Sequence, residues 1–237
     1  MTDFSNNSIQ RSESFSVGAL LTFAGGFLDA YTYVLRDGVF ANAQTGNMVL
    51  LGLRFAEGRW QEGLHYLIPI FAFALGVLLA LAIRKRYQHH PAFHWRQLVL
   101  VVECIVLFAI GFIPSGDWNP YVNIAISFVC ALQVESFRTV HGLSCATTMC
   151  TGNLRSGTEL LFHFITTKTR GSLLGALKYY GIIVVFIIGA VTGYLASKAI
   201  GIQSIWIPCV LFLFVFFLLM KKPDDRNKSN QISEGVE

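Results

Sequence analysis

Two segments of the chain carry an acidic residue at the same distance from the same polar tripeptide. In the first, Asp29 stands sixteen positions before Thr45-Gly46-Asn47, which directly follows Gln44. In the second, Glu135 stands sixteen positions before Thr151-Gly152-Asn153, so the two copies are offset by 106 residues. Carboxylate, hydroxyl and amide groups can bind a proton, a cation or a small polar solute. We therefore take these residues as candidates for a substrate path.

The two carboxylates have different basic neighbours. Glu135 has Arg138 three residues further on, one helical turn away, so an ion pair at a helix end explains Glu135 as well as a functional role does. Asp29 has Arg36 two turns further on, which is a poorer geometric match. An ionisable side chain well inside a span costs about 2.5–3.5 kcal/mol on insertion scales. Asp29 is therefore the stronger candidate for binding a proton or a cation.

The tripeptides resemble helix starts. Asparagine is a strong N-cap residue, and a glycine before it permits a sharp turn. We expect short helices that begin at Met48 and Leu154, each preceded by irregular polar backbone, and a severe effect of valine at Gly46 or Gly152. Such backbone survives at membrane depth only where it is buried in protein or lines a cavity. Two arrangements remain open: the segments re-enter the membrane, one from each side, or they are capped helices lying at the interface.

Composition places the chain among membrane proteins. Of its 237 residues, 54% are hydrophobic and 14% are charged, whereas a soluble domain has about 25% charged residues. The net charge of +4 suits contact with anionic lipid headgroups rather than with nucleic acid. The sequence has no nucleophile elbow, zinc-protease motif or phosphate-binding loop, so we expect neither an enzyme nor a cofactor.

Two clusters invite a metal interpretation, and neither is favoured. The histidine-rich stretch His89–His94 lies beside Arg84-Lys85-Arg86, whose positive charge opposes a bound cation. Cys145 and Cys150 have no matching thiols in the first copy of the repeat. We therefore expect no metal site.

Six apolar runs are long enough to cross a bilayer, which requires roughly 20 residues. They define one membrane domain over residues 17–220, between a cytoplasmic tail at 1–16 and a disordered cytoplasmic tail at 221–237. The six runs are Val17–Leu35, His65–Ile83, Gln97–Ile113, Pro120–Phe137, Lys178–Ser197 and Ser204–Met220.

The hydrophobic layout repeats with the tripeptides. Shifted by 106 residues, the first three runs fall near the last three, which gives two repeats at about 17–113 and 120–220. Three spans per repeat is an odd number, so the repeats point in opposite directions, as in many transporters. The predicted fold is therefore an all-α integral membrane protein of six transmembrane helices. It forms two inverted three-helix repeats, each with a short re-entrant or interfacial helix started by Thr-Gly-Asn.

The distribution of lysine and arginine orients this arrangement. With six spans, one side of the membrane holds 14 of these residues and the other side holds 4. The side richer in lysine and arginine faces the cytoplasm, which places both termini there.

Residues of both copies resemble a known family. Gly25-Gly26-Phe27-Leu28-Asp29, the segment Gly38–Asn47 and the segment Thr147–Arg155 are similar to the signature of the YoaK-like family, small multi-pass bacterial membrane proteins catalogued as an uncharacterised family. The resemblance covers about residues 17 to 220. It implies a location in a bacterial cell membrane and implies no particular activity.

Two classes of function fit these observations. The first is a secondary transporter or channel for a small polar or anionic solute, coupled to protons through Asp29. Helix N-termini directed inward would present their positive dipole ends to an anionic group. The alternative is a non-transporting membrane protein with a role in assembly or stress. Expected partners are the lipid bilayer and an unidentified solute, with no nucleic acid; a homo-oligomer remains open.

Overall fold

The computed structural model describes residues 14–88, 90, 94–140, 143–145, 147–148 and 150–220. The predicted disordered tail at 221–237, almost all of the tail at 1–16 and most of the histidine-rich stretch lie outside the described residues.

Each of the six predicted apolar runs corresponds to a helix. The first half of the chain forms α1 (Phe15–Leu35), α2 (Gln44–Ala56), α3 (Trp60–Tyr87) and α4 (Trp95–Ile110). The second half contains α5, a minimal antiparallel hairpin of two-residue strands, α6, α7, a 3₁₀ turn and α8. Their bounds are Asn119–Ser136 for α5, Thr139–Val140 for β1, Leu143–Ser144 for β2, Cys150–Thr167 for α6, Arg170–Ile200 for α7, Gly201–Ile205 for the turn and Trp206–Met220 for α8.

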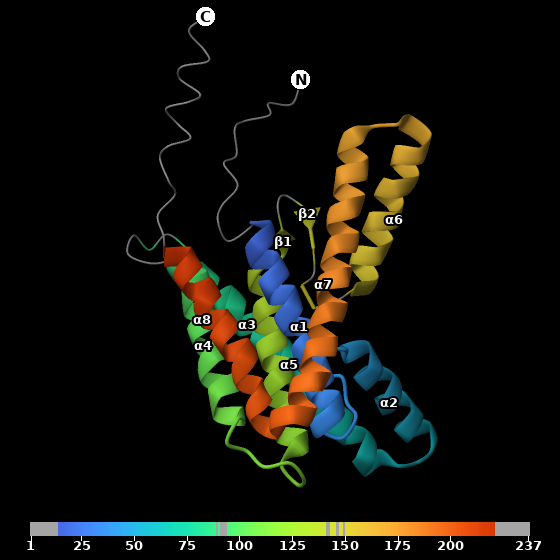
Figure 1. The fold of residues 1–237 in the computed structure, drawn as a ribbon. Coiled ribbons are helices and arrows are strands. Elements are labelled where there is room, and N and C mark those ends of the chain that lie inside the picture. Colours follow the sequence, from blue (N-terminus) through green and yellow to red (C-terminus); the bar gives the residue numbers. More distant parts are fainter. Residues whose placement is uncertain are drawn as a thin grey trace, which may run out of the picture.

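Three helical stretches among the described residues are long and apolar enough to cross a membrane by length and composition alone. They are Phe15–Leu35, Trp60–Tyr87 and Arg170–Met220, the last of which joins α7 to α8. At 16 and 18 residues, α4 and α5 are shorter. The first residues of α1 and the last residues of α8 lie at the same end of the bundle (Figure 1).

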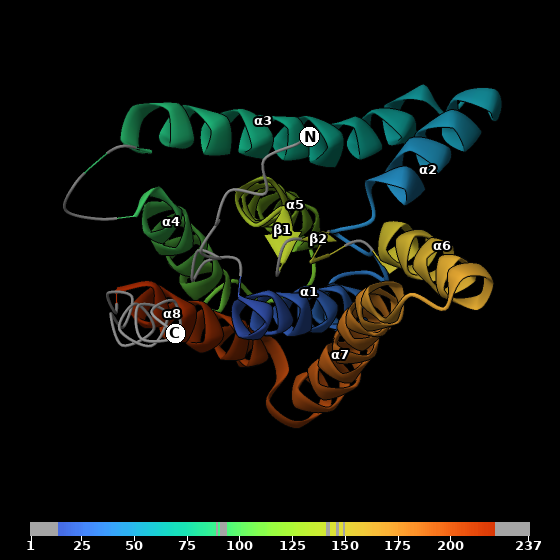
Figure 2. The ribbon, with the colours of Figure 1, turned by 90° about the horizontal axis from the view of Figure 1, so that it is seen from above.

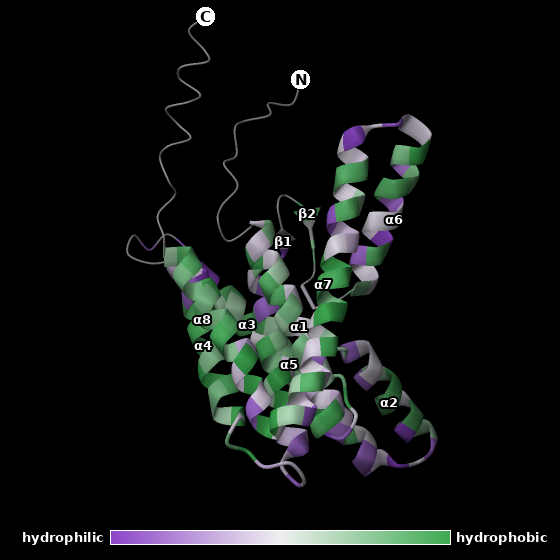
Figure 3. Cartoon of the chain, viewed as in Figure 1, coloured by the Kyte–Doolittle hydropathy of each residue, from purple (hydrophilic) through white to green (hydrophobic). Residues whose placement is uncertain are grey.

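The outer surface of the bundle is apolar and its interior is partly polar, which is the reverse of a soluble protein. Large hydrophobic side chains are exposed along α3, α7 and α8, and α8 is coloured as hydrophobic over most of its length (Figure 3). Arg36, Glu103 and Gln133, in contrast, are each at most 1% exposed. A surface of this kind is stable in contact with lipid, so the chain is an all-α membrane protein.

Glycines bring two pairs of helices into close contact. α1 packs along α7, and a Cβ atom on Gly26 would overlap the Phe186 carbonyl oxygen. α3 packs along α5, and a Cβ atom on Gly76 would lie 2.6 Å from the Phe128 carbonyl oxygen. Small residues at such crossings let two helix backbones approach closely in lipid. α4 packs along α8 and completes the bundle.

Two shorter helices begin inside the bundle. α2 and α6 start beside each other at mid-height, and from there α2 runs toward one end of the molecule and α6 toward the other (Figure 1). The view along the bundle confirms that the two starts are neighbours (Figure 2). α6 and the first turns of α7 form a helical hairpin that extends past the ends of α1 and α8.

The predicted starts of these helices at Met48 and Leu154 are wrong. The structure begins them four residues earlier, at Gln44 and Cys150, so each Thr-Gly-Asn tripeptide lies within the first helical turns. The residue before α2, Ala43, makes no side-chain capping bond. Gln44 instead closes the turn through its own side chain, which accepts a hydrogen bond from Asn47 at 3.0 Å.

The predicted role of the tripeptide glycines is also wrong. Gly46 and Gly152 are helical, and apart from neighbouring residues and the backbone of the same helix no atom lies within 4 Å of a Cβ placed on either of them. The backbone turns earlier, at Asp37 and Gly38, where φ is 66° and 68°. The first tripeptide therefore needs neither a positive φ nor a close approach, and the steric reason for a severe valine substitution does not hold.

Candidate functional site

The loops that precede α2 and α6 meet at the centre of α1. Gly25 is the middle residue of this 21-residue helix. From the first loop, the Asn42 Nδ2 donates a hydrogen bond to the Gly25 carbonyl at 3.2 Å. From the second loop, Thr148 Cγ2 and the Thr147 carbonyl oxygen would lie 3.0 and 3.1 Å from a Cβ at Gly25. A glycine at this position therefore gives both loops access to the same helix backbone.

Asp29 lies one turn further along α1 and holds the first loop. Its Oδ1 accepts a hydrogen bond from the Asn42 backbone N–H at 3.2 Å. Thr32 donates to the Asp29 carbonyl oxygen at 3.1 Å, and its hydroxyl accepts from the Ala41 N–H at 3.4 Å. The carboxyl group of Asp29 is thus oriented toward the loop. Cys150, the first residue of α6, lies within electrostatic range of it.

A row of neutral polar side chains on α5 holds both loops. Ser127 donates to the Ala41 carbonyl oxygen in the first loop at 2.7 Å. Cys130 donates to the Thr148 hydroxyl at 3.4 Å. Gln133 Nε2 donates to the Thr147 hydroxyl and to the Leu21 carbonyl oxygen of α1, both at 3.0 Å. The three donors recur every third residue and are almost completely buried, so they form one face of α5.

The sequence prediction did not identify this row. Serine, cysteine and glutamine attract little notice inside an apolar run, since none of them carries a charge. The signal that was present is their spacing of three residues, which places them on one side of a helix.

The structure separates the predicted site residues into groups. Asp29 is at the meeting point of the loops. Asn47 is buried against Gln44, and Asn153 is buried and hydrogen-bonded to the side chain of Cys145. The remaining tripeptide residues, which are Thr45, Gly46, Thr151 and Gly152, are exposed on the outer sides of α2 and α6.

Glu135 has the structural partner that its sequence neighbours suggested. Its Oε1 lies 3.6 Å from Arg138 Nη1, and the Arg138 side chain is 67% exposed. Arg138 is the second residue after α5, so this ion pair stays at the helix end, and no hydrogen bond among the described residues links Glu135 to Thr147 or Thr148.

Arg36 does not pair with Asp29. Its guanidinium is completely buried at the end of α1 and donates to the Ile113 and Pro114 carbonyl oxygens at 2.8 and 2.9 Å. It also donates to Asn119 Oδ1 at 3.1 Å and to the Tyr31 hydroxyl at 2.9 Å. Arg36 therefore fixes the link between the two halves of the chain to α1.

An open cavity of about 570 Å³ reaches the first turns of α2 from one end of the bundle. Asn47 forms part of its wall. Three carboxylates, Asp37, Glu62 and Asp117, and one imidazole, His65, also line it. The other lining residues are Val39, Tyr66, Ile68, Pro69, Pro120, Tyr121, Asn123 and Ile124. Of the three carboxylates, Glu62 is paired with Arg59.

Within the part of the chain that the structure describes, no three His, Cys, Asp or Glu side chains come together in a way that could hold a metal ion. The five cysteines are not in disulfides.

Comparisons with known proteins agree with the resemblance seen in the sequence. A family profile described as "Protein of unknown function (DUF1275)" matches residues 17–218. The UPF0700 transmembrane protein YoaK of Bacillus subtilis (strain 168) is 27% identical over 214 residues, which cover 85% of this chain and 91% of the relative. No solved structure matches the chain.

Proposed function

The chain belongs to the DUF1275 family of membrane proteins, and from this premise we propose that it is a secondary transporter or channel for a small polar solute, coupled to protons through Asp29. One observation carries the proposal. Two loops from different halves of the chain meet at the middle of a helix long enough to span the bilayer, beside a carboxyl group. Irregular backbone and an ionisable side chain at this depth are the usual marks of a substrate or ion pathway.

An inverted repeat accounts for the packing of the helices. If the halves are exchanged, α1 becomes α5 and α3 becomes α7. The α1–α7 contact then becomes the α5–α3 contact, and the α2–α3 contact becomes the α6–α7 contact. α4 and α8 pack on each other, so an exchange leaves their contact unchanged. We therefore propose six spans, α1, α3, α4, α5, α7 and α8, in two oppositely directed repeats.

The contact between α4 and α8 has the reciprocity expected at a pseudo-two-fold axis. Cys104 Sγ donates to the Cys209 carbonyl oxygen at 3.6 Å, and Cys209 Sγ donates to the Cys104 carbonyl oxygen at 3.5 Å. The two cysteines are 105 residues apart, close to the offset of 106 between the tripeptides.

Of the two arrangements left open for the tripeptide segments, we propose the re-entrant one. α2 has 13 residues, which at 1.5 Å each is about 20 Å, too short to span the bilayer. Its start at mid-height beside the start of α6 supports a helix that begins inside the membrane and leaves it on one side. A helix lying flat at the interface would instead start near one end of the bundle.

The charges of the open cavity bear on the class of solute. Asp37 and Asp117 face it beside the Glu62–Arg59 pair, and the lining includes no lysine or arginine. An anion would be repelled by these carboxylates, so a neutral polar or positively charged solute is favoured over the anionic solute considered from the helix dipoles.

The Bacillus subtilis relative supports a location in a bacterial cell membrane, and the lysine and arginine distribution supports both termini in the cytoplasm. In this orientation the open cavity faces outward. A cysteine placed at Trp118, which is 56% exposed, should react with a membrane-impermeant thiol reagent in intact cells of a cysteine-free variant.

The test of transport is solute flux into sealed vesicles that contain the purified protein. A panel of cationic, neutral and anionic small solutes is supplied at acidic and alkaline external pH, with protein-free vesicles as the control. We expect uptake of at least one cationic or neutral solute that changes with the pH gradient. If no solute in a broad panel enters faster than in the control, the alternative role in membrane assembly or stress replaces transport.

The test of the re-entrant arrangement is a distance. Thr45 and Thr151 are exposed near the neighbouring starts of α2 and α6, so Thr45→Cys and Thr151→Cys in one cysteine-free chain should be joined by a short bifunctional reagent. Interfacial helices on opposite sides would instead separate the two positions by nearly the bilayer thickness of about 30 Å.

A further inference from the structure

A second carboxyl group lies inside the bundle, away from the loops. Glu103 is near the middle of α4 and is 0% exposed. Neither of its carboxyl oxygens has a hydrogen-bond partner among the described residues. The equally buried Arg36 makes four hydrogen bonds through its two terminal nitrogens and has only its Nε without a partner among the described residues, whereas the carboxyl group of Glu103 makes none. The polar contact between helices that would be the ordinary explanation of Glu103 is absent.

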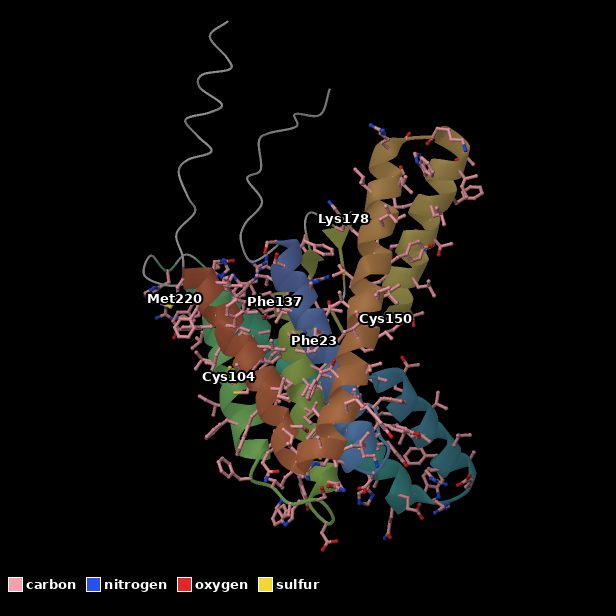
Figure 4. All side chains as sticks on the ribbon, viewed as in Figure 1. Phe23, Cys104, Phe137, Cys150, Lys178 and Met220 are labelled. Carbon is pink, nitrogen blue, oxygen red and sulfur yellow. The ribbon has the colours of Figure 1, made fainter. Side chains whose placement is uncertain are left out.

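The helices packed against α4 supply no cation near Glu103. On α8 the nearest titratable group is Cys209, whose Sγ donates a hydrogen bond to the Cys104 carbonyl oxygen. Cys104 is the sequence neighbour of Glu103 and lies at mid-height of α4 (Figure 4). On α5 it is Cys130. On α3, residues 67–83 contain no titratable side chain, and the 3₁₀ turn before α8 contains none.

The charged groups along α4 are remote. Arg96 is seven residues before Glu103, where it donates to the Ser136 carbonyl oxygen at 2.7 Å, and Arg84 of α3 stacks on Trp95 near the same end of α4. Seven residues of helix measure about 10 Å. A carboxylate without a cation or a hydrogen-bond donor is strongly disfavoured in such surroundings, whereas a neutral carboxylic acid is tolerated.

Cys130 connects this region to the candidate site. It lies within electrostatic range of both Asp29 and Glu103, and it donates to Thr148 in the loop before α6. Both acids therefore lie near Cys130, the middle residue of the polar row of α5. Glu103 also adjoins the reciprocal cysteine contact between α4 and α8, where the proposed halves meet.

We propose that Glu103 is a second proton-binding site, occupied by a proton and closed to water in this conformation, which exchanges its proton only when α4 separates from α5 or α8. In this step the carboxyl O–H bond breaks, the proton passes to a water molecule as hydronium, and the carboxylate is left in a hydrated gap between the helices. Rebinding reverses the step. The role of Glu103 in coupling rests on the proposed transport function. The statement that Glu103 holds a proton and is shielded from water does not.

Infrared spectroscopy of the purified protein in lipid tests the occupied state without any transport assay. A protonated carboxylic acid has a carbonyl stretching band separate from the amide bands, and this band shifts when deuterium replaces the proton. We expect a band that is lost in Glu103→Gln, kept in Glu135→Gln, and slow to shift after transfer to heavy water. A wild-type protein without a band attributable to Glu103, or a band that shifts as soon as heavy water is added, would overturn the proposal.

Glu103→Asp provides a second variant in case the glutamine variant does not fold. It keeps an acid at the same position with a shorter side chain, so the band should move rather than disappear. A band unchanged in Glu103→Asp belongs to another acid, which would also contradict the assignment.

The role in coupling is tested by flux in the same vesicles. Glu103→Gln should lose the response of solute flux to a pH gradient while still moving solute down its own gradient. Normal proton coupling in Glu103→Gln would show that Glu103 has no role in coupling, while the infrared band would still show that it holds a proton. Absence of flux from the wild-type protein would instead contradict the proposed function, while the infrared band would still decide whether Glu103 holds a proton.

Discussion

The loop between α1 and α2 and the loop between α5 and α6 occupy equivalent places in the two halves, yet they are held by different chemistry. In the first, a carboxyl group on the preceding helix, Asp29, accepts a backbone N–H of the loop. In the second, the neutral side chains of Gln133 and Cys130 donate to threonine hydroxyls of the loop. Glu135, the counterpart of Asp29 in the sequence, is paired with Arg138 instead.

Under the proposed inverted repeat, the two halves share a frame, meaning the packing of their helices, while different polar groups hold their loops. Similar helix packing requires similar apolar faces and small residues at the crossings. Binding of a proton or cation requires one suitably placed acid, and a second copy would add the cost of another ionisable group inside the membrane. We therefore expect substitutions in the frame to have similar effects in both halves, and substitutions of the acids to have different effects.

The largest contrast is expected between the two acids. Asp29→Asn keeps an oxygen that can accept the Asn42 N–H, so expression and thermal stability should remain near wild type, whereas the response of flux to pH should be abolished. Glu135→Gln should leave that response intact, because an ion pair with an exposed arginine contributes at most about 1 kcal/mol. Flux measured over a pH series in vesicles compares them. Normal pH-dependent transport by Asp29→Asn would make Asp29 a structural residue.

The next largest effect concerns the frame itself. Gly26→Ala and Gly76→Ala each place a Cβ against a carbonyl oxygen of the facing helix, which should cost about 1–3 kcal/mol of stability as overpacking does. Gly46→Ala and Gly152→Ala are the matched controls, since both sites are helical and open, and alanine is the better helix former. Thermal unfolding in detergent, followed by circular dichroism, measures all four. Equal losses of stability in all four variants would contradict the conclusion that Gly26 and Gly76 allow the facing helices to approach closely.

A smaller difference in stability is expected between variants of the two α5 side chains that hold the loops, Gln133 and Ser127. Gln133→Leu removes a buried donor to both Thr147 and Leu21 and should destabilise the protein by about 1–3 kcal/mol. Ser127→Ala removes one donor, to Ala41 of the first loop, and should cost about 1 kcal/mol. The same unfolding assay ranks them. A larger loss for Ser127→Ala would show that the first loop depends on α5 more than the second loop does.

The smallest expected effect is a pH dependence of stability that arises at the start of α4. This helix is capped by His94, whereas its partner α8 continues from a 3₁₀ turn. Burial, followed by the nearby charge of Arg96, lowers the pKa of His94 from 6.5 to about 4. Its neutral Nδ1 accepts the Arg96 N–H at 3.3 Å.

Between these two pKa values the unfolded chain binds more protons than the folded one, so stability should decrease as pH falls from 6.5 toward 4. His94→Asn keeps a capping oxygen and should reduce this slope. Melting temperatures at neutral and acidic pH provide the measurement. An unchanged slope in His94→Asn would assign the acid sensitivity to other groups.

Much of the fold was predictable from local properties of the sequence. The runs Val17–Leu35 and Pro120–Phe137 agree with α1 and α5 within two residues at each end, because a long apolar run between polar segments is defined by the residues themselves. The family resemblance is confirmed for the same reason, since its motifs are continuous in the chain.

The helix starts at Gln44 and Cys150 were not predictable from capping preference. Asparagine at the tripeptides indicated a cap, but the structure turns the chain earlier, at Asp37 and Gly38, and lets Gln44 and Asn47 satisfy each other. A local preference of about 1 kcal/mol is easily outweighed when a buried loop must find partners for all of its backbone groups.

The sequence by itself determined which segments are apolar helices, that an acid stands sixteen residues before Thr-Gly-Asn twice, and that Asp29 has no basic residue close to it in the sequence. Only the tertiary structure decided that both loops meet at Gly25 and that the α5 row of Ser127, Cys130 and Gln133 holds them. It also decided that Glu103 has no hydrogen-bond partner among the described residues. The reason is physical. The hydropathy of a run is a property of adjacent residues, whereas the partner of a buried polar atom depends on which distant backbone the fold brings to within 3 Å or so of it.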